Sequence, residues 1–271
     1  MHSLSLNLGP VLVLTRENPK RLHASPFSSF STAVCIDPNG VLATAWHNIG
    51  NFWRTWTPYD VDGLRRVGRA RWENPERHEL LFAVPLAPVD EPDMLTLFPC
   101  LDICGSPKRD VAVVELGGRG KHRPLPYVRL GQPPMLGEVV SCVGLHHPPN
   151  TPLDAVGMPA GFAVSHDSTR VIATTDTHLY LDCILKRGNS GGPVLRQGTW
   201  ELVGICVDIL PPDLSETEVG IRKWLSRAVR AEIVGQKYVE LKRKCIEREL
   251  AGGRSWCSVA ATVRTPYDLF A

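Results

Sequence analysis

Between residue 10 and about residue 210, the apolar residues of the chain fall into short runs that are separated by turn residues. Each run has the length of a β-strand, and the segments between the runs show almost no helical periodicity. The segment DPNG at 37–40 predicts a hairpin turn. The pattern therefore predicts an all-β protein, built as a pair of β-barrels or as a sandwich. The predicted strands lie at 11–14, 28–36, 40–46, 80–84, 110–116, 138–145, 161–165, 170–175, 178–184, 193–198 and 200–210.

A polar segment that contains several prolines, at 120–134, divides the predicted strands into two sets of roughly equal size. Such a segment is typical of a connection between domains. We therefore predict one strand-rich domain at 1–122 and a second at 123–221. The remaining residues, 222–271, are predicted to form a C-terminal helix and a tail.

The predicted helix follows from a change of pattern after about residue 220. Val234, Tyr238, Leu241 and Cys245 recur at helical spacing, with charged residues among them, and Gly252 follows the last turn. The charged positions have two interpretations. They form either a docking surface for a regulatory protein partner or the solvated outer face of a helix that packs on the strands.

The composition is that of an ordinary globular protein. The chain has 271 residues, of which 43% are hydrophobic and 21% charged, and its net charge is +2. This charge favours neither nucleic acid nor an anionic membrane as a partner. No apolar run approaches the length of a membrane span, and the first residues lack the features of a secretory signal. We expect a cytoplasmic protein without a cofactor.

The eight cysteines have two interpretations, since an even number could form four disulfides. Several of them lie inside apolar strand-like runs, which favours free, buried thiols and a reducing compartment. Cys100 and Cys104, together with His146 and His147, suggest a zinc site as an alternative. Their spacing is loose and no second cysteine pair stands at zinc-finger spacing, so we predict no metal site.

The stretch LKRGNSGGPVL at 185–195 places Ser190 among three glycines and a proline. A serine hydroxyl becomes a useful nucleophile when an imidazole takes its proton, a carboxylate orients the imidazole, and N–H groups receive the oxyanion. His47 directly follows a strand-like run, where a rigid scaffold can present a catalytic group. Asp110 opens the strand-like run 110–116, and Asp102 is its main rival.

Three motifs, in the order His, Asp, Ser, carry a resemblance to a known family. GNSGGP at 188–193, TAWH at 44–47 and RDVAVVEL at 109–116 resemble the motifs of the chymotrypsin-fold, trypsin-like serine peptidases. Within that superfamily, the segments 181–194 and 130–148 resemble the HtrA/Deg branch. The resemblance implies two six-stranded antiparallel β-barrels with a C-terminal α-helix. Too few residues follow the second barrel for the PDZ domain that many HtrA members carry.

The resemblance also implies the role of each site residue. Ser190 would be the nucleophile, His47 the general base and then acid, and Asp110 the orienting carboxylate. The oxyanion hole would lie in the loop of Gly188, Asn189 and Ser190, with the N–H groups of Gly188 and Ser190 as donors.

Two departures from the family pattern concern activation and disulfides. Asn48 stands where secreted members carry a cysteine after the histidine, and Asn189 replaces the acidic residue that pairs with a freed N-terminus in zymogen-activated members. Neither the expected disulfide nor activation by cleavage is therefore supported.

The resemblance places the base of the specificity pocket six residues before the nucleophile, at Ile184. The edge strand that would pair with an extended substrate contains Val207, Asp208 and Ile209. The predicted function is that of a serine endopeptidase that cleaves proteins or peptides after small or medium apolar residues. Two alternatives stay open. Asp208 could enter the pocket wall and restore acidity there, and the whole chain could be a catalytically silent, protease-like binding or scaffold module.

Overall fold

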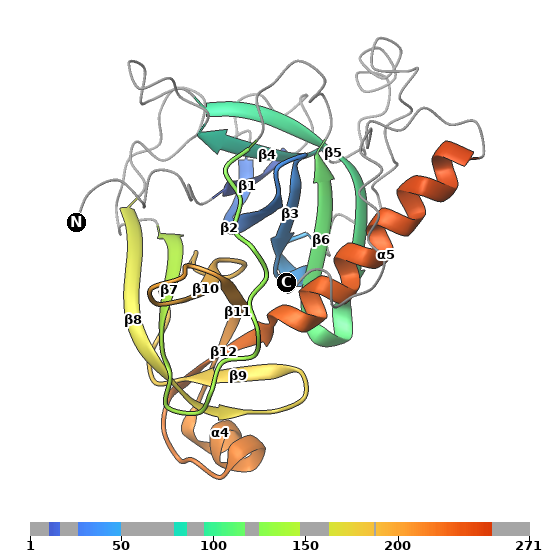
Figure 1. Cartoon of the computed structure of the whole chain (residues 1–271). Coiled ribbons are helices and arrows are strands. Elements are labelled where there is room, and N and C mark those ends of the chain that lie inside the picture. The colour runs from blue at the N-terminus through green and yellow to red at the C-terminus, as the bar shows by residue number, and fades with distance from the viewer. Residues whose placement is uncertain are drawn as a thin grey trace.

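The computed structural model describes residues 11–16, 27–49, 79–85, 95–116, 125–146, 163–186 and 188–250. These residues form two closed antiparallel β-barrels and a long C-terminal helix (Figure 1), as the resemblance implied. The first barrel has the order β1-β2-β3-β6-β5-β4, with β1 Val11–Arg16, β2 Phe27–Asp37, β3 Val41–Thr44, β4 Glu79–Pro85, β5 Leu95–Ser106 and β6 Val111–Leu116. The second has the order β10-β11-β12-β9-β8-β7, with β7 Val139–His146, β8 Ala163–Thr174, β9 His178–Leu181, β10 Pro193–Arg196, β11 Leu202–Leu210 and β12 Leu225–Arg230.

Four helices accompany the strands in the described part of the chain. They are the 3₁₀ turns η2 (Trp46–Asn48) and η4 (Pro107–Arg109), and the α-helices α4 (Pro212–Val219) and α5 (Ala231–Leu250). None of the described helices is long and apolar enough to cross a membrane.

Several of the observed elements differ from the sequence pattern. The pattern lacked β5, where Pro99 and Asp102 interrupt the apolar residues, and β12, where Ser226 and two arginines do so. The two predicted strands at 161–165 and 170–175 are one strand, β8, because the polar residues between them pair with β7. Since β12 closes the second barrel, this barrel extends beyond the predicted boundary at 221, and α5 begins only at Ala231.

Alternate residues of the central strands serve two different cores. In β3, Leu42 points into the first barrel, while Val41 and Ala43 pack between the barrels. In β6, Val114 lies in the barrel interior and Val113 lies between the barrels. A strand that is buried on both faces shows a continuous apolar run, which is why these segments lack polar alternation.

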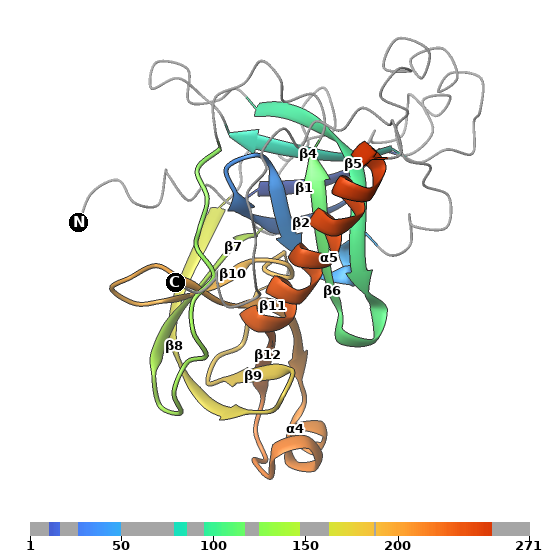
Figure 2. The ribbon, with the colours of Figure 1, turned by 45° about the vertical axis from the view of Figure 1, so that its right-hand side comes forward.

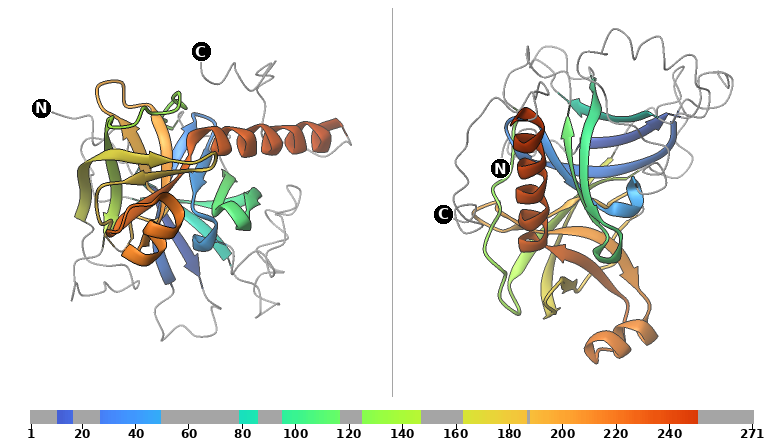
Figure 3. Two further views of the ribbon diagram at one scale, coloured as in Figure 1. Left: turned by 90° about the horizontal axis from the view of Figure 1, so that it is seen from below. Right: turned by 90° about the vertical axis from the view of Figure 1, so that its right-hand side faces the viewer.

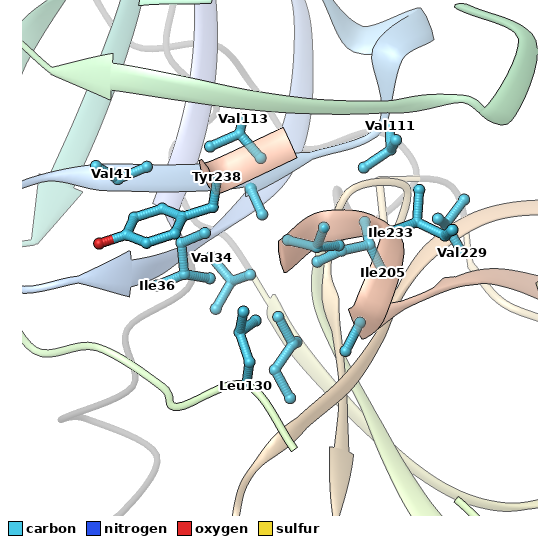
Figure 4. Close-up of a cluster of buried hydrophobic side chains, with 14 of the residues drawn as sticks. Val34, Ile36, Val41, Val111, Val113, Leu130, Ile205, Val229, Ile233 and Tyr238 are labelled. Carbon is cyan, nitrogen blue, oxygen red and sulfur yellow. The ribbon is translucent and has the colours of Figure 1, made fainter. Parts of the chain in front are cut away.

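The core between the barrels also receives the apolar face of α5. Figure 4 shows Val34 and Val113 of the first barrel, Ile205 of the second and Tyr238 of α5 in this single cluster. The helix runs along β5 and β6 and starts beside β11 and β12 (Figures 2 and 3). It therefore joins the two barrels.

Polar contacts fix the position of α5. The Tyr238 hydroxyl donates a hydrogen bond to the Asp37 carboxylate, and the Lys242 ammonium lies 3.1 Å from the same carboxylate. Burial opposes the ionisation of Asp37, but Lys242 and Tyr238 outweigh it and lower the pKa of Asp37. The inner face of α5 is thus occupied within the molecule.

The segment between the barrels is hydrogen-bonded to both of them. The Val128 N–H donates to the Cys35 carbonyl of the first barrel at 2.9 Å. The Gly131 N–H donates to the Leu202 carbonyl of the second barrel at 2.8 Å. This connection and α5 together hold the barrels in one relative orientation, on which a site between them depends.

Candidate active site

Two neighbouring turns at one end of the first barrel carry His47 and Asp110. β3 ends at Thr44 and continues into η2, which contains His47. Asp110 follows η4 in the left-handed conformation, with φ of 52°, and opens β6. Because Thr44 and Ala112 are partners across β3 and β6, the two turns lie side by side.

The Asp110 carboxylate binds His47 through two hydrogen bonds. Oδ2 lies 2.7 Å from the imidazole Nδ1, and Oδ1 accepts the His47 backbone N–H at 2.8 Å. The hydrogen bond to Asp110 raises the pKa of His47 above its ordinary value; partial burial opposes this shift, and the charges of Asp110 and Asp208 add to it. With a proton on Nδ1, Nε2 is the free acceptor that a general base needs.

Asp102, the rival of Asp110 in the sequence, lies within β5, and its carboxylate accepts the N–H of the adjacent Ile103 at 2.8 Å. The structure therefore brings His47 to Asp110.

Ser190 lies in a loop that both barrels hold. Its carbonyl accepts the Thr32 N–H at 3.1 Å and the Asn48 side-chain amide at 3.0 Å, both from the first barrel. The next residue, Gly191, donates its N–H to Cys206 of the second barrel at 2.7 Å. Gly191 has φ of 84°, and a Cβ there would lie 2.0 Å from the Thr32 carbonyl oxygen, so only glycine fits.

Thr32 connects the two sides of this loop. Its hydroxyl donates to the Gly188 carbonyl at 2.6 Å and accepts the Leu145 N–H of β7 at 2.9 Å. Sequence reasoning missed Thr32, because one threonine inside a strand carries no signal of its own. The sequence marked Asn48 only as a departure from the family pattern. In the structure its side-chain amide extends from the first barrel to the Ser190 carbonyl.

The Ser190 hydroxyl donates to the Val207 carbonyl at 2.7 Å. To pass its proton to His47, the hydroxyl must turn away from this carbonyl. Val207 lies where the ladder between β11 and β12 is irregular, between Cys206 and Asp208. Val207, a predicted substrate-binding residue, therefore contacts Ser190 through its backbone carbonyl, while its side chain packs in the core between the barrels.

Asn189 is fully buried beneath the loop. Its Oδ1 accepts the Ser165 hydroxyl at 2.9 Å, and its backbone N–H donates to the Lys186 carbonyl at 3.1 Å. A Cβ on Gly144 would lie 2.7 Å from the Asn189 side chain, so β7 comes close at this point. Ser165 therefore holds the Asn189 side chain in place.

Ser226 is a second residue that the sequence did not indicate. It is buried, donates to the Cys183 carbonyl at 2.8 Å and accepts the Leu185 N–H at 2.9 Å, which holds the backbone on both sides of Ile184. Ser226 is also the register partner of Ile209. The structure therefore brings Ile184, which is 61% exposed, and Ile209, which is 36% exposed, to the two sides of Ser226.

Asp208 is bound to Arg227 of β12. The guanidinium Nε lies 3.0 Å from Oδ1 and Nη2 lies 2.5 Å from Oδ2, a bidentate ion pair. Asp208 therefore does not lie with Ile184 and Ile209, because its carboxylate is directed towards Arg227.

The zinc alternative has little support in the described residues. Cys104 is buried in β5, where burial and the nearby Glu240 raise its pKa to about 11, while His146 ends β7 of the other barrel. The Cys100 side chain and His147 lie outside the described residues. Within the described part of the chain, no three His, Cys, Asp or Glu side chains are arranged to hold a metal ion. The strand cysteines Cys35, Cys142 and Cys206 are buried and form no disulfide among the described residues.

Comparison with known proteins agrees with this architecture. The structure is similar to the MamO protease domain of Magnetospirillum magneticum in its apo form, with a TM-score of 0.50, 15% identity, and coverage of 85% of this chain and 97% of that chain. It is also similar to Deg5, with a TM-score of 0.51, 14% identity, and coverage of 85% of this chain and 87% of that chain. No curated protein matches the sequence. The sequence model described as a trypsin-like peptidase domain matches residues 31–205, and the chain therefore belongs to the trypsin-like peptidase family, as its motifs indicated.

Proposed function

We propose that the chain is a serine endopeptidase that acts on proteins or peptides through Ser190, His47 and Asp110. Ser190 Oγ attacks the scissile carbonyl while His47 Nε2 takes its proton, and the protonated His47 then gives that proton to the leaving amine. Water hydrolyses the acyl-enzyme by the same route in reverse. The double hydrogen bond between Asp110 and His47 is the observation that carries this proposal, because it orients the imidazole and selects its tautomer.

The loop from Gly188 to Ser190 supplies the oxyanion donors in this mechanism. The N–H groups of Gly188 and Ser190 receive the developing charge, with Asn189 anchoring the turn between them. Loss of one such donor typically costs about 2.7–4 kcal/mol of transition-state stabilisation. Gly188 has φ of 97°, and a Cβ there would lie 2.4 Å from the Leu145 carbonyl oxygen, which accounts for glycine at this position.

Substrate binding turns Ser190 towards His47 in this proposal. An extended peptide would pair as an antiparallel strand with β11 beyond Ile205, where the pairing of β11 with β10 ends, and donate an N–H to the Val207 carbonyl. That carbonyl now accepts the Ser190 hydroxyl. Competition for one acceptor would release the hydroxyl when a substrate is in place.

The proposed specificity is for a small or medium apolar residue before the cleaved bond. Ile184, Ile209 and the Ser226 hydroxyl, which is already paired with backbone groups, offer no charge to a cationic side chain. A matrix of peptide substrates tests this point. Rapid cleavage after arginine, with none after alanine, valine or leucine, would overturn it.

Fluorophosphonate labelling tests the enzymatic function itself. Wild-type protein should be labelled, Ser190→Ala should not, and His47→Ala should be labelled far more slowly because the serine lacks its base. The alternative is a catalytically silent binding or scaffold module. The hydrogen bond from the Ser190 hydroxyl to the Val207 carbonyl is compatible with it, because the hydroxyl is directed to Val207 and not to His47. Absence of labelling in the wild type would favour that module.

Two further parts of the proposal concern location and regulation. The free thiols fit a reducing, cytoplasmic location. For a regulatory protein partner, α5 offers only its outer face, where Arg243 and Glu247 are exposed. If the charge-reversed variant Arg243→Glu, Glu247→Arg shows unchanged regulation in cell extract, the outer face of α5 is not the interface for a regulatory partner.

A further inference from the structure

The segment of β11 next to Ser190 has two chemically different faces. Cross-strand partners share a face of a sheet. One row consists of Leu181, Ser226 and Ile209, and it faces the segment around Ile184. The other row consists of Tyr180, Arg227 and Asp208. The first row is apolar apart from a hydroxyl that is already paired, and the second is charged.

The charged row is connected to α4. Arg227 Nη1 lies 3.1 and 3.2 Å from the two carboxylate oxygens of Glu218, and the Tyr180 hydroxyl donates to Glu218 at 2.7 Å. One guanidinium thus serves two carboxylates, those of Asp208 and Glu218. Burial, and then the charge of Arg227, lower the pKa of the nearby His178, so this imidazole adds no positive charge at neutral pH. Taken together with Glu218, the row carries one negative charge in excess.

We propose that Asp208, held in place by Arg227, selects a cationic residue at the second position before the cleaved bond. This inference rests on the proposed function. Successive side chains of an extended substrate point to opposite faces. If the residue before the cleaved bond lies over Ile209 and Ser226, the preceding residue lies over Asp208.

The exposure of the Asp208 side chain and the negative potential around it fit this role. Its side chain is 39% exposed, and its carboxylate can accept further hydrogen bonds beyond the two from Arg227. The charge of Asp208 also reaches His47, whose pKa it helps to raise. The same negative potential that favours a protonated imidazole favours a lysine or arginine side chain beside it.

Peptide binding to the Ser190→Ala protein tests the inference without any chemical step. The probes are dye-labelled peptides with valine before the scissile bond and lysine, alanine or glutamate at the preceding position, and fluorescence anisotropy gives their affinities. The lysine peptide should bind about five-fold more tightly than the alanine peptide, and the glutamate peptide about five-fold more weakly, as expected for partly exposed charges.

Two variants in the Ser190→Ala background identify the source of the preference. Asp208→Asn and Glu218→Gln each remove the excess negative charge, so the difference between the lysine and glutamate peptides should fall to about two-fold or less. Glu247→Gln removes an equal charge from the distant end of α5 (Figure 1) and should leave the preference intact. Because Glu218 lies behind Arg227, its variant keeps the test valid if Asp208→Asn fails to fold.

The outcomes separate this inference from the proposed function. Equal affinity for the lysine and glutamate peptides, absence of binding by all three, or a preference that survives both variants overturns the role of Asp208. If fluorophosphonate labels Ser190 in the wild type, the enzymatic function stands even then. If labelling fails but the preference is present and depends on Asp208, the subsite stands and the enzymatic function falls.

Discussion

His47 and Asp110 lie in two adjacent turns of one barrel, whereas Ser190 lies in a loop that both barrels hold. The first half of the site needs only the pairing of β3 with β6 and one carboxylate–imidazole contact. The second half needs Thr32 and Asn48 from the first barrel and Cys206 from the second. His47 and Asp110 should therefore tolerate changes in barrel docking that would disorganise the loop of Ser190.

Asp110→Asn should have the largest effect on activity and little effect on the nucleophile loop. An amide favours the wrong imidazole tautomer, and such a change costs roughly 10⁴-fold in kcat. Steady-state kinetics on a peptide substrate measure the loss. Asp102→Asn is the matched control and should stay within about three-fold of wild type, since its carboxylate lies in β5, where it accepts the N–H of the adjacent Ile103. Equal losses in both variants would contradict the assignment of Asp110.

Gly191→Ala should damage the other half of the site. The added methyl group meets the Thr32 carbonyl oxygen and the backbone has positive φ, so the free energy of unfolding should fall by about 2–5 kcal/mol and activity should fall with it. Gly198→Ala is the control, because Gly198 also has positive φ but has open space around its Cβ position. Chemical denaturation compares the two. Equal destabilisation would mean that backbone strain, and not contact between the barrels, accounts for the effect.

Asn48→Ala should have an intermediate effect that is confined to the reactivity of Ser190. It removes one of the two hydrogen bonds to the Ser190 carbonyl, which should cost about 1–3 kcal/mol. The rate of fluorophosphonate labelling should fall about ten-fold or more, while the pH dependence set by His47 stays the same. Asn39→Ala, in the exposed hairpin turn, should label at the wild-type rate.

The pH profile should show the smallest and most specific difference. A general base must be neutral, so kcat/KM should decrease as the pH falls through the raised pKa of His47. The free energy of unfolding should show the opposite pH dependence. The interaction of protonated His47 with Asp110 stabilises the protein fully below the ordinary pKa of His47, and this contribution is lost as the pH rises through the raised pKa. In Asp110→Asn the acidic limb of kcat/KM should move to lower pH. An unchanged limb would show that Asp110 does not control the imidazole.

The sequence by itself indicated the strands of a pair of barrels or a sandwich, the C-terminal helix and the three motifs that contain His47, Asp110 and Ser190. These features are local: a strand has a period of two residues, and a glycine-rich turn and a strand end are visible in short segments. The strands β5 and β12 were missed for the same reason, because polar residues or proline interrupt their local pattern although their neighbours in the sheet complete them.

Only the tertiary structure decided which residues meet at the site. The Thr32 N–H and the Asn48 side-chain amide hold the Ser190 carbonyl across a separation of more than 140 residues, and no periodicity along the chain records such a contact. The register of β11, β12 and β9 decided that Ile209 shares a face with Ser226 while Asp208 shares the opposite face with Arg227. A shift of one residue in that register would exchange the two faces, so the roles of Ile209 and Asp208 depend on strand pairing and not on their neighbours in sequence.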